Sequence, residues 1–225
     1  MSIITIFHGS EKEIKNPNKN KGKIYNDYGQ GFYCTKHKNL AAQWACRYGE
    51  DGIISEYEID TEDLDILVLD ENYHILNWLS ILSKNREFSD VTVINNAEYV
   101  IENYMIDYEK YDIIIGYRAD DAYYRFVREF LSGLVGIQTL EDSMYLGEQG
   151  LQVFIQSERA FSYLRFIKSY EVDQEEYFLI NKGSIDKANS QYEELKKDNE
   201  SKDIYIRDIK GGVLNEDSIP KIKIK

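Results

Sequence analysis

The chain has 225 residues, of which 43% are hydrophobic and 13% aromatic, enough to form a packed core rather than a disordered segment. Its formal net charge of −13, without a dominant block of Lys or Arg, argues against extended binding to nucleic acid backbones or anionic membranes. Its two cysteines are too few for a disulfide framework, and no His, Cys and Asp residues have metal-ligand spacing, so no bound metal is expected.

The N-terminal residues lack the apolar run and cleavage pattern of a signal peptide, and no segment is long and apolar enough to span a membrane. The chain is rich in Ile, Lys, Asn and Asp and has only two prolines, a composition typical of a bacterial source. We therefore expect a protein of the bacterial cytoplasm that does not bind membranes, and leave open its delivery to another cell.

In chain order, residues 3–7 form a β-branched and aromatic run that predicts a buried strand, with His8 at its exit. A polar loop over 11–26 follows and is long enough to cover a site. Residues 29–35 then combine a glycine-rich turn with strand-forming residues, and 38–47 predicts a helix that carries Trp44. Such a corner can close around a flat polar ring, although an ordinary β-turn-α corner has the same pattern.

The remaining elements are short. Apolar runs predict further strands over 53–59, 64–69, 111–116, 151–155, 166–172 and 204–209. Apolar periodicity predicts helices over 72–84, 124–131, 140–146 and 158–164, the second with Asp120-Asp121 at its N-cap and Gly133 at its C-cap. The charged run 182–202 predicts a solvated helix with no further role. Short strands mixed with short helices indicate an α+β fold, with one domain over 1–180. We interpret 181–225 as its extension, a charged helix and a final strand before a fraying tail.

Two motifs occur in order near the N-terminus. His8-Gly9-Ser10 lies at a strand end, and Gly29-Gln30-Gly31-Phe32-Tyr33 follows it. This arrangement resembles the His-Tyr-Glu branch of the ADP-ribosyltransferases, which includes diphtheria toxin and the poly(ADP-ribose) polymerases. Residues further along match the toxin-type version of the motif, namely Thr35, Ala41, Ala42 and Trp44.

A closer resemblance covers residues 4–172, which are similar to a bacterial family described as domain of unknown function 3990, in the same clan. The shared patterns fall at 27–33, 43–45 and 115–121 and in a Gln-containing strand that precedes a Glu-Arg-Ala helix. The resemblance implies an ADP-ribosyltransferase-like split antiparallel β-sandwich with peripheral helices.

The same resemblance implies a site for NAD as co-substrate, with His8, Tyr33 and Gln152 as its catalytic residues. The residues expected to bind NAD are His8, Gly9, Ser10, Gly31, Phe32, Tyr33, Thr35 and Trp44. His8 would hydrogen-bond a ribose hydroxyl, the Gly9 backbone would hold the nicotinamide amide, and Tyr33 and Trp44 would enclose the ring. From the residues alone, His8 also fits a histidine bonded to backbone neighbours, and Trp44 a core residue.

The chain departs from the family pattern at the third motif. The branch normally has a Glu that binds the ribose and polarises the nucleophile, whereas the corresponding strand here begins at Gln152. Its alternation places Leu151, Val153 and Ile155 on one face and Gln152 with Phe154 on the other. An amide cannot accept a proton as a carboxylate does, so repeated chain elongation is not expected. Glu148 and Glu158, which flank the strand, and Gln149 are alternatives for this role.

We therefore expect a mono-ADP-ribosyltransferase that releases nicotinamide and modifies a macromolecule, a protein rather than a nucleic acid. The proteins with which the resembled family is associated suggest a bacterial toxin, effector or defence protein, with a neutralising antitoxin as a partner. Two alternatives have different products. An inactive NAD-binding module would leave NAD intact, and an NAD glycohydrolase would release free ADP-ribose.

Overall fold

A seven-stranded sheet runs through the centre of the molecule, in the order β4-β5-β6-β2-β1-β3-β7. The computed structural model describes residues 2–46, 49–119, 121–148, 150–199 and 201–213. The strands are β1 (Ile3–Ser10), β2 (Phe32–Thr35), β3 (Gly52–Asp60), β4 (Ile66–Val68), β5 (Ile113–Gly116), β6 (Gln152–Ile155) and β7 (Leu164–Val172). Neighbouring strands are antiparallel except β4 and β5, which are parallel. The sheet and its surrounding helices confirm the α+β class.

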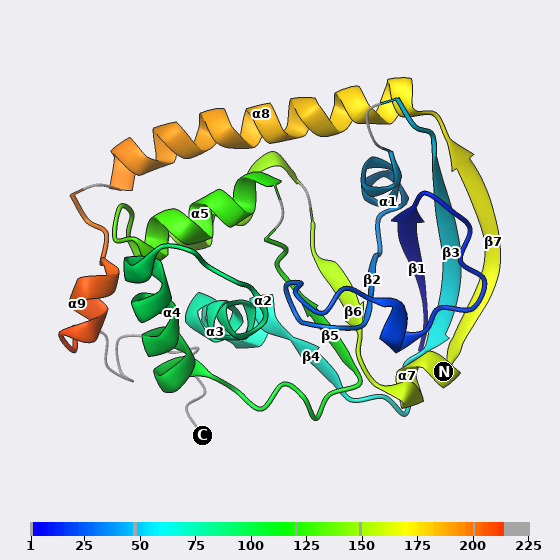
Figure 1. The fold of residues 1–225 in the computed structure, drawn as a ribbon, viewed down its shortest axis with the longest axis horizontal. Coiled ribbons are helices and arrows are strands. Elements are labelled where there is room, and N and C mark those ends of the chain that lie inside the picture. Colours follow the sequence, from blue (N-terminus) through cyan, green and yellow to red (C-terminus); the bar gives the residue numbers. More distant parts are fainter. Residues whose placement is uncertain (1, 47–48, 120, 149, 200, 214–225) are drawn as a thin grey trace.

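The sheet is narrowest between β1 and β2, which pair only at Phe7 and Thr35. In contrast, β1 pairs with β3 along its whole length, and so does β2 with β6. The sheet therefore consists of two half-sheets, β1-β3-β7 and β4-β5-β6-β2, which Figure 1 shows on the right and in the centre of the view. Because so little backbone pairing joins them, side chains at this junction contribute to holding the halves together.

Helices surround the second half-sheet and bridge to the first (Figure 1). They are α1 (Lys38–Ala45), α2 (Leu69–Asn72), α3 (Ile75–Asn85), α4 (Val91–Tyr104), α5 (Asp121–Leu131), α6 (Ile137–Ser143), α7 (Glu158–Ser162), α8 (Gln174–Asn199) and α9 (Ile206–Lys210), with 3-10 turns η1 (Lys19–Lys21) and η2 (Leu146–Glu148). The long helix α8 begins directly after β7 and runs past α1 to α5 and α6. No helix within these described ranges is long and apolar enough to cross a membrane.

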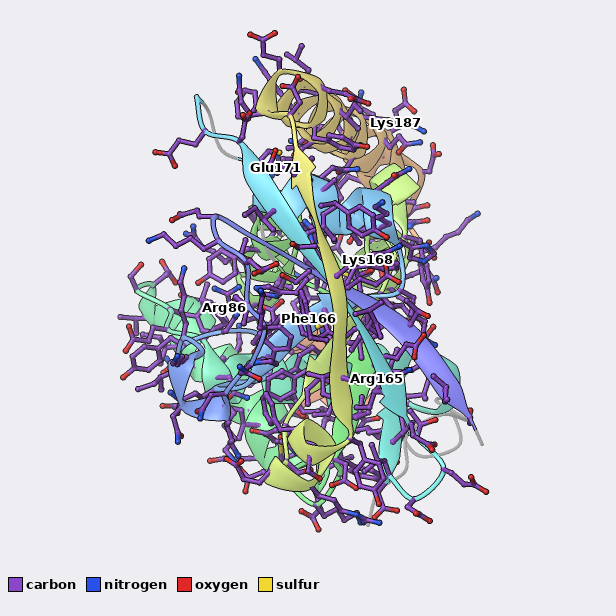
Figure 2. All side chains as sticks on the ribbon, turned by 90° about the vertical axis from the view of Figure 1, so that its right-hand side faces the viewer. Arg86, Arg165, Phe166, Lys168, Glu171 and Lys187 are labelled. Carbon is purple, nitrogen blue, oxygen red and sulfur yellow. The ribbon has the colours of Figure 1, made fainter. Side chains whose placement is uncertain are left out.

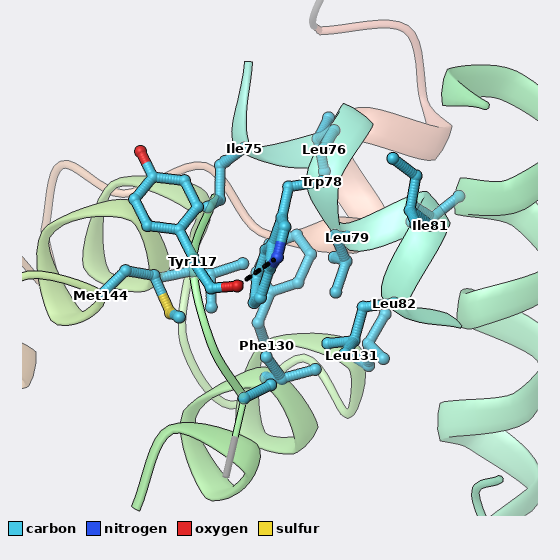
Figure 3. Close-up of a cluster of buried hydrophobic side chains, with 14 of the residues drawn as sticks. Ile75, Leu76, Trp78, Leu79, Ile81, Leu82, Tyr117, Phe130, Leu131 and Met144 are labelled. Atoms are coloured by element: carbon cyan, nitrogen blue, oxygen red, sulfur yellow. Dashed lines mark hydrogen bonds between the residues drawn. The ribbon is translucent and has the colours of Figure 1, made fainter. Parts of the chain in front are cut away.

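The largest core lies around α3, which is buried on all sides rather than along the single stripe that the sequence predicts. Every residue from Ile75 to Ser83 is buried, and Trp78 has no exposed surface. Figure 3 shows Trp78 among aliphatic side chains, with its indole Nε1 donating to the Tyr117 carbonyl at 3.1 Å. A buried indole N–H requires such an acceptor, so this bond fixes α3 against the segment that follows β5.

The outer edge of the first half-sheet is β7, whose far side has no strand partner among the described residues. Figure 2 shows this edge with the charged side chains of Arg165, Lys168 and Glu171 along it. Charged residues on an edge strand disfavour pairing with a strand of another molecule. These charges therefore disfavour association of the unpaired backbone of β7 with a strand of another molecule.

Several predicted elements have other bounds in the structure: the helix predicted over 140–146 is α6, and the one predicted over 72–84 is divided into α2 and α3. β1 continues to Ser10, because β3 pairs with it up to that residue, so His8 lies within the strand and not at its exit. The predicted strand over 64–69 is shorter, since α2 already begins at Leu69. The predicted final strand over 204–209 is wrong: it is helix α9, which buries Ile206 and Ile209 on one face. That spacing of three residues suits a helix as well as a strand-like apolar run. Asp120, proposed with Asp121 as an N-cap, and the tail predicted after Pro220 lie outside the described residues.

The charged C-terminal helix is confirmed, but it is not merely solvated. α8 starts at Gln174, spans position 180 without a break, and buries Ala188 and Tyr192 completely. The Tyr192 ring stacks on Phe126 with centroids 3.9 Å apart. Burial opposes the ionisation of Glu129 beneath it, yet hydrogen bonds from Arg125 at 2.8 Å and Lys196 at 3.0 Å lower the pKa of Glu129 overall. One face of α8 thus belongs to the core.

Replacing Tyr192 with Ala tests how much α8 contributes to the fold. The change removes a fully buried ring and should lower the free energy of unfolding by about 3–5 kcal/mol. Leu179→Ala in the same helix is the control, since Leu179 is 66% exposed and its loss should cost less than about 0.5 kcal/mol. Urea unfolding curves of both variants measure the difference. Equal stabilities would show that α8 is only appended to the domain.

Candidate functional site

His8 lies where the two half-sheets meet. Its Nδ1 is 2.6 Å from the carbonyl oxygen of Tyr33, and its ring lies over Phe32 with centroids 4.4 Å apart. A carbonyl oxygen only accepts, so Nδ1 carries the proton and donates it, which leaves Nε2 as an acceptor. Burial lowers the pKa of His8, and the bond to Tyr33 opposes this only in part. The imidazole is therefore neutral at pH 7 and held in one tautomer.

Tyr33 directs its side chain to the opposite face of β2 from Phe32, because adjacent residues of a strand alternate. Its ring packs against the Phe154 ring, with the two ring centroids 4.7 Å apart. Its hydroxyl donates to the Gly29 carbonyl at 2.6 Å and accepts from the Tyr28 amide at 3.1 Å. Burial raises the pKa of Tyr33 well above its usual range. The hydroxyl is thus fixed in the glycine turn, and the ring is the part of Tyr33 that can contact a ligand.

The motif glycines are required by the protein itself. A Cβ on Gly9 would overlap the Ala41 carbonyl of α1 and lie 2.8 Å from the Ala45 nitrogen. A Cβ on Gly31 would overlap the Phe154 ring and lie 2.6 Å from the Ile155 carbonyl. Real Cβ atoms do not approach backbone atoms so closely. Close packing of α1 on β1, and of β2 on β6, accounts for both glycines without a ligand.

Trp44 lies on α1 and has a cation as its ring neighbour. The Arg118 guanidinium carbon is 5.4 Å from the Trp44 ring centre, within cation–π range. Arg118 is only 3% exposed and also faces Tyr123. The indole Nε1 of Trp44 is buried, and no described residue offers it a hydrogen bond. The sequence patterns do not single out Arg118, although it lies inside the one at 115–121.

The other predicted binding residues have local partners. Thr35 is buried, and its hydroxyl accepts from the His37 amide at 3.1 Å, at the start of α1. The Ser10 hydroxyl donates to the Lys12 carbonyl at 2.8 Å. The structure thus brings His8 together with Phe32 and the Tyr33 backbone, while the Tyr33 and Trp44 rings have different neighbours.

Gln152 is part of a buried polar network centred on Asp27. Its side-chain amide nitrogen donates to Asp27 Oδ2 and to the Tyr117 carbonyl, each at 2.9 Å. Asp27 also accepts from Arg86 Nη2 at 2.6 Å and from the Ala119 amide at 2.8 Å. Gln152 is 4% exposed and Asp27 2%. Both amide protons of Gln152 are therefore committed to acceptors of the protein.

The alternative third-motif residues are placed as follows. Glu158 is exposed and begins α7, beyond the opposite end of β6 from Gln152. Gln149 lies outside the described residues, as does the side chain of Glu148. Gln152 is thus the polar side chain at the start of β6, with Val153 and Ile155 facing one core and Phe154 the other, as the alternation predicts.

A family model described as "Protein of unknown function (DUF3990)" matches residues 4–166. The chain belongs to this family. The DUF3990 match begins in β1, ends in β7, and includes the half-sheet junction and the Asp27 network. Helices α8 and α9 follow the matched region. Neither the curated proteins nor the solved structures contain a match to the chain.

Gln152→Glu tests why this position is an amide. A carboxylate there would donate nothing to Asp27 or Tyr117 and would place a second negative charge in the network. We expect a loss of about 3–5 kcal/mol at pH 7, partly recovered at pH 5, where the introduced carboxylate takes up a proton. Gln138→Glu is the control. The Gln138 amide donates to Asp142 at 2.9 Å in the same way, but this pair is exposed, so the loss of stability should stay below about 0.5 kcal/mol. Urea unfolding compares the two; equal costs would contradict the network's role.

The partial burial of His8, which lowers its pKa, predicts a pH dependence of stability. Because its folded pKa is lowered, the unfolded chain binds the proton first, starting near pH 6.5. Stability should therefore fall as the pH drops below about 6.5, by up to roughly 1.4 kcal/mol per pH unit. His8→Asn keeps a donor for Tyr33 but does not titrate. Unfolding at pH 7.5 and 5.5 should show a steeper loss in the wild type; identical slopes would mean that His8 is solvated.

Proposed function

We propose that this protein is a mono-ADP-ribosyltransferase that uses NAD as co-substrate and releases nicotinamide. The observation that carries the proposal is the position of His8. It is neutral, bound through Nδ1 to the Tyr33 carbonyl, and located where the half-sheets join at a single residue pair. The His8-Gly9-Ser10 and Gly31-Phe32-Tyr33 motifs thus meet in space as well as in sequence order.

The chemistry proposed for this site breaks the bond between ribose C1′ and the nicotinamide nitrogen. Nicotinamide leaves with the electron pair, and an acceptor atom bonds to C1′ after an oxocarbenium-like transition state. His8 Nε2, as an acceptor, would take a hydrogen bond from a ribose hydroxyl and hold the sugar. The motif assigns the nicotinamide ring to Tyr33 and Trp44, although the Tyr33 ring packs on Phe154 and Trp44 faces Arg118, so both rings contact one NAD molecule only if it spans the junction of the half-sheets.

The state of Gln152 restricts the kind of transfer. A carboxamide whose protons are bound by Asp27 and Tyr117 does not remove a proton from an incoming nucleophile. The acceptor must therefore be nucleophilic already or supply its own base. That base takes the proton of the acceptor atom as this atom attacks C1′. This favours single transfer to a protein acceptor over chain elongation. We assign Gln152 a positioning role, in place of the catalytic role expected from the motif.

The lack of a proton acceptor at Gln152 also favours a second candidate, a module that binds NAD or a related nucleotide without chemistry. In that case the network around Asp27 maintains the fold and nothing activates an acceptor. A role as a bacterial toxin, effector or defence protein, neutralised by a partner, is compatible with transfer and belongs to this proposal.

Pure protein incubated with adenylate-labelled NAD and a bacterial lysate tests the proposal, with His8→Asn as the matched variant. His8→Asn retains the donor to Tyr33 but lacks Nε2, so transfer should fall by about 100-fold or more while the circular dichroism spectrum is unchanged. A labelled band that His8→Asn produces at the wild-type rate would refute the site. Free ADP-ribose as the sole product would identify a glycohydrolase. Binding of NAD without its consumption would identify the second candidate.

A further inference from the structure

A cavity of about 580 Å³ lies beside the start of α1 and contains none of the residues assigned to NAD. It is bounded by α1, by the turn η2 and by α8; Figure 1 shows α8 along the top of the view with α1 below its right-hand end, and both α1 and η2 contact α8. Its lining residues are Phe7, Lys36, His37, Lys38, Asn39, Leu40, Gln43, Gly147 and Ser184. A volume of this size is within the range of small-molecule sites, about 300–1,000 Å³.

The charge around the cavity is opposite to that of the chain. Lys36, His37 and Lys38 line it, and none of the described residues in the lining is acidic, although the chain has 40 acidic and 27 basic residues. The Lys38 ammonium lies over the ring of Tyr170, which is a weak partner and no counter-ion. The cavity therefore attracts an anion in a protein that otherwise repels one.

The helix start adds to this charge. Within the described part of the chain, α1 has no side-chain N-cap and no acidic residue in its first turn. The first N–H groups of α1 and the positive end of its dipole lie at the end of the helix where Lys36 and Lys38 line the cavity, and such a grouping of positive charge favours the binding of a negative group. Phosphate is the anion that such N–H groups and lysines hold together most commonly.

An unsatisfied acceptor is present in the same lining. Gln43 Oε1 is buried and receives no hydrogen bond from any described residue. A buried carbonyl without a donor is costly, and a phosphate offers it nothing. A sugar hydroxyl would satisfy it. The apolar sides of Phe7 and Leu40 complete a wall for the rest of such a molecule.

We propose that this cavity binds a small phosphate ester that also carries hydroxyl groups, such as a sugar phosphate or a nucleotide. Lys36, Lys38 and the first turn of α1 hold the phosphate, and Gln43 accepts from a hydroxyl. The proposal is independent of NAD turnover, because it concerns binding at residues that the transfer reaction does not use.

Isothermal titration of the full chain with inorganic pyrophosphate and with ribose 5-phosphate tests the site in the absence of NAD. The double variant Lys36→Ala/Lys38→Ala should weaken both ligands about tenfold or more, and added salt should weaken them further. Lys21→Ala/Lys23→Ala is the control, since it removes the same charge at the same spacing from an exposed loop. It should bind both ligands as the wild type does. No binding by the wild type, or equal losses in both double variants, would overturn the proposal.

Gln43→Leu separates the two parts of the site. It should weaken ribose 5-phosphate several-fold and leave pyrophosphate unchanged, whereas equal weakening of both would refute the hydroxyl contact. Competition distinguishes the source of the ligand. Displacement of NAD by pyrophosphate would assign the cavity to the phosphates of NAD, and simultaneous binding would assign it to a separate phosphate ester. Either result can be obtained whether or not the protein transfers ADP-ribose.

Discussion

The fold depends on the buried carboxylate of Asp27. It comes from the loop that precedes the glycine turn, and it receives hydrogen bonds from Arg86 after α3, from the Ala119 backbone and from Gln152 in β6. A carboxylate that is 2% exposed is tolerated only when its charge is paired and its oxygens are bonded. Asp27 therefore ties the helical region, the second half-sheet and the glycine turn into one unit, and the turn in turn fixes the Tyr33 hydroxyl.

This network explains, in terms of the protein's own contacts, why position 152 is a Gln and not a Glu. The two groups that its amide nitrogen reaches, Asp27 and the Tyr117 carbonyl, are both acceptors. Only a donor satisfies them, and glutamate at pH 7 has none to give. The same carbonyl also accepts from Tyr28 and Trp78. The acceptors around position 152 therefore favour an amide there, and an amide does not take up a proton from a nucleophile.

Local patterns in the sequence are sufficient for much of the sheet. The alternation over 151–155 places Phe154 and Val153 on opposite faces, and both are buried in the cores that those faces meet. The sequence patterns do not predict features that depend on contacts between residues far apart in the chain. They miss helix α4, although Asp90 caps it with bonds to Thr92 and Val93. The buried face of α8 depends on Phe126, and the pairing of Arg118 with Trp44 joins segments whose contact no periodicity reveals.

The short helix α1 connects the two candidate binding regions. Gly9 allows its backbone to pack directly on β1, next to His8, and a side chain at that position would push the helix away. The same helix carries Trp44 on one turn and presents its uncapped start to the basic cavity. α1 is held by close backbone contacts to two strands, at Gly9 of β1 and at Gly52 of β3, with the small residues Ala41 and Ala42 buried beneath it, so little space is left for it to shift. The proposed phosphate ester would therefore bind to the same helix that carries Trp44 and that packs, at Gly9, on the strand of His8.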